Sequence, residues 1–445
     1  MQGLLVTYAI VLVGAVISLR QPVTGLFIYV GLSVLRPEAI WGWAGNMRGL
    51  SKLEAIPLLI GWAFQGFGSW RFGKARAIVI SLILFGIWAM LSGAQAVDGD
   101  TAADALLEFQ KTFLPFLIGI TMIKNEKQAR QLLWVIVLCQ GYVSLDMNRV
   151  YLGGYNRAHA EGFGGMDNNS FGISLLTVLG GALALALSST GWIAKAVAGG
   201  ITLLILHTVL LTFSRGAFVG LLSVGAAAVW IFPKRPKYLA PVVCAGLIAV
   251  MLTGPELSAR LATTFAPREE RDGSAESRFD LWKDCFTVIG REPIFGVGPR
   301  NWGLVAEEFG WPRGKEGHSL WVQMAAEVGV PGFLLLFLFY TLTIKRLWPI
   351  ARGRSPGIDG STAMLAAGLI LGLVGFAVSA QFVTVEGLEP PYWMTMIGAI
   401  LLKIRSLADE APAAVPGPSK RAVPLAPAVA VPLRPRPTLV RPPTR

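Results

Sequence analysis

Apolar segments long enough to cross a lipid bilayer recur along almost the whole chain, from Gly3 to about Lys403. About 20 predominantly apolar residues suffice for one membrane-spanning helix. The runs are continuous rather than alternating, so they do not fit the strands of a transmembrane barrel. With 53% hydrophobic residues, 15% charged residues and a mean hydropathy of +0.57, the chain is predicted to be an all-α polytopic membrane protein.

Thirteen apolar segments qualify as candidate membrane-spanning helices. Thirteen spans would place the N-terminus outside the cytoplasm, whereas a re-entrant or interfacial hairpin formed by the first two segments would leave an even number. We therefore expect about 12 (12–13) transmembrane helices. The candidates are residues 3–19, 22–35, 53–68, 77–96, 106–123, 131–152, 169–189, 192–213, 216–232, 238–254, 318–344, 362–384 and 391–404.

Basic residues fall in alternate loops between these segments, and this pattern orients the chain across the membrane. Loops on the cytoplasmic side of a membrane protein carry an excess of Lys and Arg. The basic loops are therefore predicted to be cytoplasmic, and the loops between them periplasmic. The basic loops lie at residues 71–76, 124–130, 195, 234–237 and 345–354, and the others at 153–168, 214–216, 255–317 and 385–391.

The longest of the predicted periplasmic loops, residues 255–317, is rich in both charges and aromatic side chains. It holds nine basic and eleven acidic residues, a net charge of 9 − 11 = −2, interleaved with Phe and Trp. Large aromatic side chains need a surface to bury against, which a disordered linker does not offer. We expect one large, partly helical loop lying on the membrane domain, and we take it as the reaction centre. Since this loop is almost neutral, the net charge of +12 does not indicate a nucleic-acid-binding face.

The composition changes after the last apolar segment. Residues 1–407 are predicted to form one transmembrane domain, and residues 408–445 a disordered cytoplasmic tail rich in Pro, Ala and Arg. Residues 411–445 hold ten of the 27 prolines, and such a segment cannot build a hydrophobic core. The three cysteines are too few for a disulfide framework, and no Cys/His cluster has the spacing of zinc ligands. We therefore expect neither a metal nor a cofactor.

Arg215 lies inside an apolar run, residues 192–232, that is too long for one span, so the chain must turn back near it. An arginine close to the membrane is costly unless it is paired or faces a watery cavity, which makes Arg215 a functional candidate. The alternative is an arginine whose side chain reaches the lipid headgroups.

The segment 155–172 combines polar side chains with four glycines. Gly-rich polar loops let the backbone approach a ligand closely, so this loop is a candidate substrate-binding element. The alternative for its asparagines is that, with Asp167, they cap the helix that follows. The substrate-binding candidates here are Arg157, His159, Asn168 and Asn169.

Three further candidates come from the polar loop and its end. Arg278 shares one helical face with Trp282, although an ion pair with a neighbouring acidic residue explains it about equally well. Arg300, after the turn at residues 296–298, is a further candidate for substrate binding. His318 stands where the chain re-enters the membrane, and a neutral imidazole can accept a proton near pH 7. A lone histidine is nevertheless more often structural than catalytic, and His207, in the middle of an apolar segment, is expected to be a hydrogen-bonded core residue.

Four motifs occur in a fixed order: DNNSFG, then TFSRGAFVGL, then SRFDLW with PIFGVGPRNW, and last HSLWVQMAAEVGVPG. Together with the large loop before the last motif, they resemble the bacterial O-antigen ligase superfamily, most closely the branch of exosortase-associated O-glycosylation ligases. The resemblance covers roughly residues 155–345. The family often has His-Asn where this chain has His318-Ser319.

The resemblance implies a glycosyltransferase of the bacterial inner membrane with its active site facing the periplasm. The donor would be a glycan on undecaprenyl pyrophosphate, and the usual acceptor is the lipid A–core. His318 corresponds to the family's catalytic histidine, and Arg215 and Arg278 to the arginines that bind the diphosphate. The planar guanidinium group suits phosphate oxygens, so the reaction needs no metal, and attack opposite the leaving group inverts the anomeric carbon.

Other functions use the same features. An O-antigen polymerase would take a second lipid-linked repeat unit as acceptor, and a protein O-oligosaccharyltransferase would take protein hydroxyls. A flippase for lipid-linked glycans belongs to a different class and predicts internal repeats, which the sequence lacks. We therefore place the flippase below the three enzymes.

Overall fold

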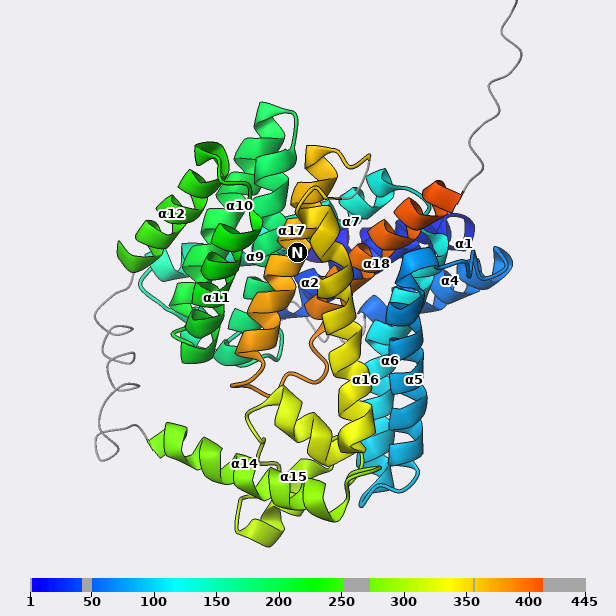
Figure 1. Cartoon of the computed structure of the whole chain (residues 1–445), viewed down its shortest axis with the longest axis vertical. Coiled ribbons are helices and arrows are strands. Elements are labelled where there is room, and N and C mark those ends of the chain that lie inside the picture. Colours follow the sequence, from blue (N-terminus) through cyan, green and yellow to red (C-terminus); the bar gives the residue numbers. More distant parts are fainter. Residues whose placement is uncertain (1, 42–49, 252–272, 355–356, 411–445) are drawn as a thin grey trace, which may run out of the picture.

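The computed structural model describes residues 2–41, 50–251, 273–354 and 357–410 (Figure 1). Within these ranges all regular secondary structure is helical, apart from one isolated bridge between Phe163 and Met166. The predicted tail from residue 411 onward, and residues 252–272 of the polar loop, lie outside the described residues. The N-terminal helices are α1 (Gln2–Arg20), α2 (Pro22–Leu35), α3 (Pro37–Trp41), α4 (Leu50–Phe64), η2 (Gly73–Ala75), α5 (Arg76–Gly93), α6 (Gly99–Met122), α7 (Glu126–Leu152) and α8 (Arg157–Ala160). They are followed by α9 (Asn168–Ser188), α10 (Trp192–Leu211), α11 (Arg215–Ile231), α12 (Pro236–Met251), α14 (Gly273–Arg291), α15 (Trp302–Val305), η4 (Ala306–Phe309), α16 (Leu320–Ala351), α17 (Gly360–Ser379) and α18 (Glu389–Glu410).

The helices follow the apolar segments. Each of the thirteen predicted segments overlaps one helix, and the second, at residues 22–35, coincides with α2. Six helical segments among the described residues are long and apolar enough to cross a membrane, namely η2 with α5, α6, α9, α10, α16 and α17. The chain is therefore a multi-pass helical membrane protein, and the figure of about 12 spans stays a prediction.

Polar side chains fix where several helices begin. Asp98, Asn125, Asp167, Ser214 and Asp359 each precede a helix, and each side chain accepts a hydrogen bond from the backbone amide three residues later. Such caps satisfy one of the amides that the first helical turn leaves without a partner. The cap predicted at Asp167 is thus confirmed.

The centre of the molecule is the pair α9 and α17, which pack side by side (Figure 1). Glycines on both helices bring the backbones together: a Cβ at Gly180 would lie 2.4 Å from the carbonyl oxygen of Gly368, and one at Gly372 would lie 2.1 Å from that of Thr177. Small residues at such contacts are how membrane helices approach closely, because apolar burial alone does not drive helices together in lipid. Helices α7, α10 and α11 also pack against α9.

The basic loops gather at one end of the helices. Arg405 of α18 forms an ion pair of 2.5 Å with Glu126 at the start of α7, and Arg130 donates to both Ser188 and Ser361 at 2.6 Å. The backbone amide of Lys74 donates to Ser406 at 2.9 Å in the same region.

The loops at residues 153–167, 292–319 and 380–388 gather at the opposite end, together with α14 and α15 (Figure 1). We call this end the site face. The alternation predicted from the positions of Lys and Arg is therefore present in the fold, and which end faces the periplasm stays a prediction.

Helix α16 is broken at Gly329, whose φ of 72° is outside the helical range. The break leaves three backbone carbonyls of α16 open, and neighbouring groups donate to them. The amide of Val297 donates to Ala326 O at 3.0 Å, that of Gly298 to Glu327 O at 2.8 Å, and the indole of Trp88 to Val328 O at 2.9 Å. The sequence analysis treated residues 318–344 as one span, whereas the structure divides it into a short arm on the site face and a long helix.

Glycine is required on both sides of this junction. A Cβ at Gly329 would lie 2.0 Å from the carbonyl oxygen of Ile294, and one at Gly296 would lie 2.4 Å from that of Glu327. The segment 293–298 can therefore lie against the opened turn of α16 only because neither glycine carries a side chain. The predicted turn at residues 296–298 is confirmed, and its function is to dock the polar loop on α16.

Helix α14 confirms that the polar loop is partly helical. It crosses the site face at the foot of the bundle (Figure 1) and packs against α16. Leu281, Cys285 and Val288 of α14 form a small core with Trp302 and Ala326. Cys285 is therefore a packing residue.

We predict that the site face is periplasmic, because Lys and Arg concentrate at the other end. A cysteine at Glu307 should react with a membrane-impermeant maleimide in intact bacteria, and a cysteine at Arg354 only after permeabilisation. Both would be introduced in a background where Cys139, Cys244 and Cys285 are alanine. The reverse pattern of labelling would contradict this orientation.

Candidate active site

A cavity of about 600 Å³ opens on the site face, where four parts of the chain meet. It is bounded by the end of α2, the loop before α9, the part of the polar loop from Arg300 to Glu316, and the loop between α17 and α18. We call it the site cavity. Its polar lining residues are Arg36, Asp167, Ser170, Arg300, Lys315, Glu316, Gln323, Thr384 and Glu386.

His318 lies next to this lining, two residues before α16 begins. Its backbone is in the left-handed region, with a φ of 50°, which costs a residue other than glycine roughly 1–3 kcal/mol. Hydrogen bonds on both sides hold it there: Gly317 O accepts from the indole of Trp282 at 3.0 Å, and Leu320 N donates to Ala380 O at 2.8 Å. Such backbone strain persists where the surrounding structure fixes it, which is common at functional sites.

The charges around His318 keep its imidazole neutral. Its pKa is lowered to about 4, first by burial and then by the positive charges of Arg278 and Lys315, while Asp167 acts in the opposite direction. Arg278 belongs to α14, Lys315 to the end of the polar loop, and Asp167 to the loop before α9. Two of the predicted catalytic residues, His318 and Arg278, are therefore close enough for the charge of Arg278 to act on the imidazole, whose lowered pKa favours its neutral form near pH 7.

Arg278 is placed by α14. Trp282, one turn further along this helix, donates to the carbonyl of Gly317, so α14 is tied directly to the residue before His318. Phe286, one turn beyond Trp282 on the same helical face, is 59% exposed, so the contact with the residue before His318 is made at Trp282.

Arg215 is the first residue of α11, directly after the cap at Ser214. The carbonyl of its neighbour Gly216 accepts a hydrogen bond of 3.1 Å from Ser379, where α17 ends and the loop at residues 380–388 begins. This is the loop that Leu320 N also contacts. The segments that carry Arg215 and His318 thus contact neighbouring residues at the end of α17, and the joint action of Arg215 and His318 on one diphosphate stays a prediction.

The loop before α9 and the first residue of that helix contact the segment before Arg215 and border the site cavity near His318. The side-chain amide of Asn168 donates to Thr212 O at 2.9 Å and lies 3.4 Å from Nδ1 of His159, whose ring packs 5.1 Å from that of Phe213. Phe213 lies two residues before Arg215. Asp167, the residue before Asn168, lines the site cavity and acts on His318.

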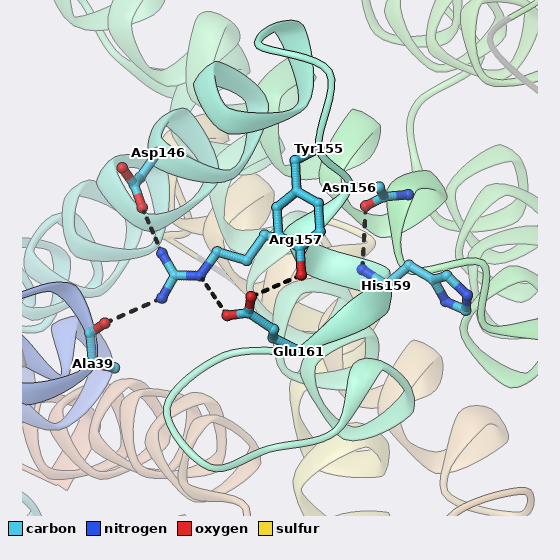
Figure 2. Close-up of polar contacts among 7 residues, drawn as sticks. All are labelled: Ala39, Asp146, Tyr155, Asn156, Arg157, His159 and Glu161. Carbon is cyan, nitrogen blue, oxygen red and sulfur yellow. Dashed lines mark hydrogen bonds and ion pairs between the residues drawn. The ribbon is translucent and has the colours of Figure 1, made fainter.

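Arg157 has protein partners in the same region, as Figure 2 shows. Its guanidinium group forms ion pairs with Asp146 at 3.2 Å and Glu161 at 3.3 Å, and donates to Ala39 O at 3.1 Å. These contacts join α3, α7 and α8. Asn169 likewise donates to Asp167 at 3.1 Å. The structure thus gives both residues a role in shaping the loop, and their contact with substrate stays a prediction.

Arg300 lies at the junction of several cavities. It lines the site cavity and two further cavities, and it shares with His318 a left-handed backbone, with a φ of 60°. Its amide donates to the carboxylate of Glu327 at 2.7 Å, and its charge acts on Glu386.

Sequence reasoning missed three polar residues beside Arg300. Gln323 is 5% exposed and Glu327 is 1% exposed, and both lie on the short arm of α16. They stand four residues apart in an apolar segment, so they share one helical face, and this spacing was a usable signal. Glu386 comes from the loop after α17, and burial raises the pKa of its carboxyl group. Nothing local in the sequence connects it with the other two.

These features define a multi-pass helical membrane protein with a polar site at one end of its helices. Residues 200–337 match the family model described as O-antigen ligase. The match covers the last three of the four motifs and supports the membership of this chain in the O-antigen ligase superfamily. It indicates an enzyme of the ligase or polymerase kind and points to lipid-linked glycans as substrates. Comparison with curated proteins gives no match.

The matched region contains Arg215, Arg278, Arg300 and His318. The loop that carries Arg157, His159, Asn168 and Asn169 precedes it. The structure nevertheless places that loop against two parts of the matched region. One is the segment before Arg215, and the other is the site cavity beside His318.

We predict that replacing Lys315 by methionine raises the pKa of His318, because a like charge that opposes protonation is lost. Histidine labelled with ¹³C would be titrated by NMR in detergent, where the chain has only three histidines to assign. Lys345→Met, on the long arm of α16, is the matched control and should leave the His318 resonance unmoved. A wild-type His318 that titrates near 6.5 would show that the site does not lower its pKa.

Proposed function

We propose that the chain is an O-antigen ligase-type glycosyltransferase that moves a glycan from undecaprenyl pyrophosphate to an acceptor hydroxyl. We take the lipid A–core as the acceptor and the periplasmic face of the inner membrane as the place of reaction. One observation carries the proposal: His318, with a lowered pKa and within reach of the charges of Arg278 and Lys315, lies beside a polar cavity of about 600 Å³ at one end of the membrane helices.

The proposed reaction uses these residues in distinct roles. Arg278 and Arg215 bind the diphosphate through their guanidinium groups and offset the charge that develops on it. His318 takes the proton of the acceptor hydroxyl as its oxygen forms a bond to the anomeric carbon. The bond from that carbon to the diphosphate breaks, and undecaprenyl pyrophosphate leaves with the electron pair. Attack from the opposite side inverts the configuration.

The low pKa of His318 fits this order of events. Burial, and after it Arg278 and Lys315, depress it in the absence of substrate, and Lys315 lines the cavity that would receive an anion. A bound diphosphate offsets their charge, so the imidazole becomes more basic when the donor is in place. A base is most effective with a pKa near the working pH, and donor binding moves His318 in that direction.

A second cavity, of about 510 Å³, offers a place for the lipid part of the donor. It runs along α6 and includes Arg300, which also lines the site cavity. Its end near Asp104 and Glu108 is polar and lies toward the site face, whereas the end near Leu114 and Ile118 is apolar. A groove that joins the site cavity at Arg300 and becomes apolar along α6 suits an isoprenoid chain. We place the polyprenyl chain there.

A polymerase or a protein O-oligosaccharyltransferase would use the same donor and base. The acceptor distinguishes them, so the test is which glycan a strain lacking the protein accumulates. A ligase defect leaves finished chains on the lipid carrier, a polymerase defect leaves single repeat units, and a protein-directed enzyme leaves lipopolysaccharide unchanged.

We predict that His318→Ala lowers the transfer rate by about 10²–10⁴-fold, the usual effect of losing a general base. The variant should still insert in the membrane and bind the lipid-linked donor, which would stay unconsumed. Transfer would be followed with purified protein, donor and acceptor in detergent. His159→Ala is the control, because its ring lies against Phe213 on the same face. Loss of transfer in His159→Ala with normal transfer in His318→Ala would assign the base to His159.

We also predict that Arg215→Lys and Arg278→Lys each impair transfer although the charge is kept, because lysine cannot form two parallel hydrogen bonds to a diphosphate. Arg291→Lys is the matched control: it lies on α14 too, but its partner is the exposed Glu308 at 3.2 Å. If both test variants transfer at the wild-type rate, the diphosphate binds elsewhere.

A further inference from the structure

The side chain of Gln323 uses all its hydrogen-bonding capacity between separate parts of the site face. Its carbonyl oxygen accepts from the amide of Gly317 at 2.7 Å and from the hydroxyl of Thr384 at 2.8 Å. Its amide nitrogen donates to Glu327 at 2.9 Å and to Glu386 at 2.8 Å. A side-chain amide can accept two bonds and donate two, and here all four are made.

Each of these partners leads to a segment that carries His318 or lines the site cavity. Gly317 immediately precedes His318. Thr384 and Glu386 belong to the loop that contacts Leu320 and the start of α11. Glu327 accepts the amides of Arg300 at 2.7 Å and Trp302 at 3.3 Å, and so holds the turn that carries Arg300.

The chemistry at position 323 is demanding. A carboxylate there could not donate to two acidic neighbours, and an apolar side chain would leave buried polar groups without partners, which is costly. Only 5% of Gln323 is exposed, and all four of its polar contacts are with the protein. It therefore touches the segments that carry reacting groups rather than the reacting groups themselves.

We propose that Gln323 is a positioning residue that holds the His318 segment and the Arg300 turn in one fixed arrangement. Through Gly317 it sets where the imidazole stands, and through Glu327 it sets where the Arg300 backbone stands. Both residues have strained left-handed backbones, with φ of 50° and 60°, and so need such support. This inference rests on the proposed function, in which the base and the diphosphate must be correctly spaced.

The test compares three variants of the full-length protein, purified in detergent. Gln323→Met keeps the size of the side chain and removes its hydrogen bonds, and it should lower kcat by about 10²-fold, as expected for misplaced reacting groups. Thr384→Val removes one of the four bonds and should lower kcat by roughly fivefold. Thr341→Val is the matched control, because that hydroxyl bonds only within the long arm of α16 and is exposed, and its rate should be unchanged.

A double-mutant cycle separates positioning from general stability. Gln323→Met should cost at least about tenfold less when Arg300 is already lysine, because residues that act as one unit are not additive. Additive losses would overturn the proposal, as would a wild-type kcat in Gln323→Met. If Gln323→Met does not fold, judged from its thermal unfolding, the cycle is run with Thr384→Val. Its roughly fivefold loss should then largely disappear when Arg300 is already lysine, and an undiminished loss would overturn the proposal.

Binding of inorganic pyrophosphate, measured by calorimetry, distinguishes this inference from the proposed function. If the wild-type protein transfers no glycan, the proposed function fails, and Gln323 is then judged by binding alone. Weaker pyrophosphate binding in Gln323→Met than in Thr341→Val would support the positioning role. Equal binding in the two variants would contradict it.

Discussion

The break in α16 at Gly329 is the constraint on which the site depends. An unbroken helix would keep its carbonyls for itself, whereas the break opens those of Ala326, Glu327 and Val328 to outside donors. The segment 293–298 donates two backbone hydrogen bonds, to the carbonyls of Ala326 and Glu327. This docking places the Arg300 turn beside the short arm of α16, on the same side as His318.

The short arm of α16 is therefore the base of the site. It starts at the cap Ser319, directly after the strained His318, and carries Gln323 and Glu327 on its inner face. The polar groups buried there are costly unless each has a partner, and the hydrogen bonds of Gln323 and Glu327 supply those partners. The same bonds that satisfy buried groups thus also fix the geometry in which a base and a cation could act.

The balance of charge gives the site its chemical character. Burial, and after it the charges of Arg278 and Lys315, lower the pKa of the His318 imidazole, while Asp167 acts in the opposite direction. A neutral histidine surrounded by positive charge is a poor base in an empty site and a better one beside an anion. An enzyme with a diphosphate substrate would gain from this arrangement, because the base strengthens only after the donor is bound.

Much of the membrane architecture could be predicted from the sequence, since hydropathy depends on local runs of residues. The segment 22–35 became α2, and the cap at Asp167 followed from residue type alone. The meeting of Arg278 and His318 was also within reach, because both belong to the one large polar loop and its end.

What the sequence did not predict depends on contacts between distant segments. Gln323 meets Glu386 across 63 residues, and the break at Gly329 becomes visible only when Ile294 is seen packed against it. Arg157 was chosen as a substrate-binding candidate from its polar loop, but its ion-pair partner Asp146 comes from the preceding helix. No pattern of neighbouring residues encodes these pairs.

The central claim is that a diphosphate site and a basic histidine face each other. The most direct measurement is the pKa of His318 by NMR with and without saturating pyrophosphate. The account predicts that the anion raises this pKa from about 4 toward its ordinary value, because it offsets the charges of Arg278 and Lys315. Pyrophosphate that binds and leaves the His318 titration unchanged would contradict the account, since the anion would then occupy some other site.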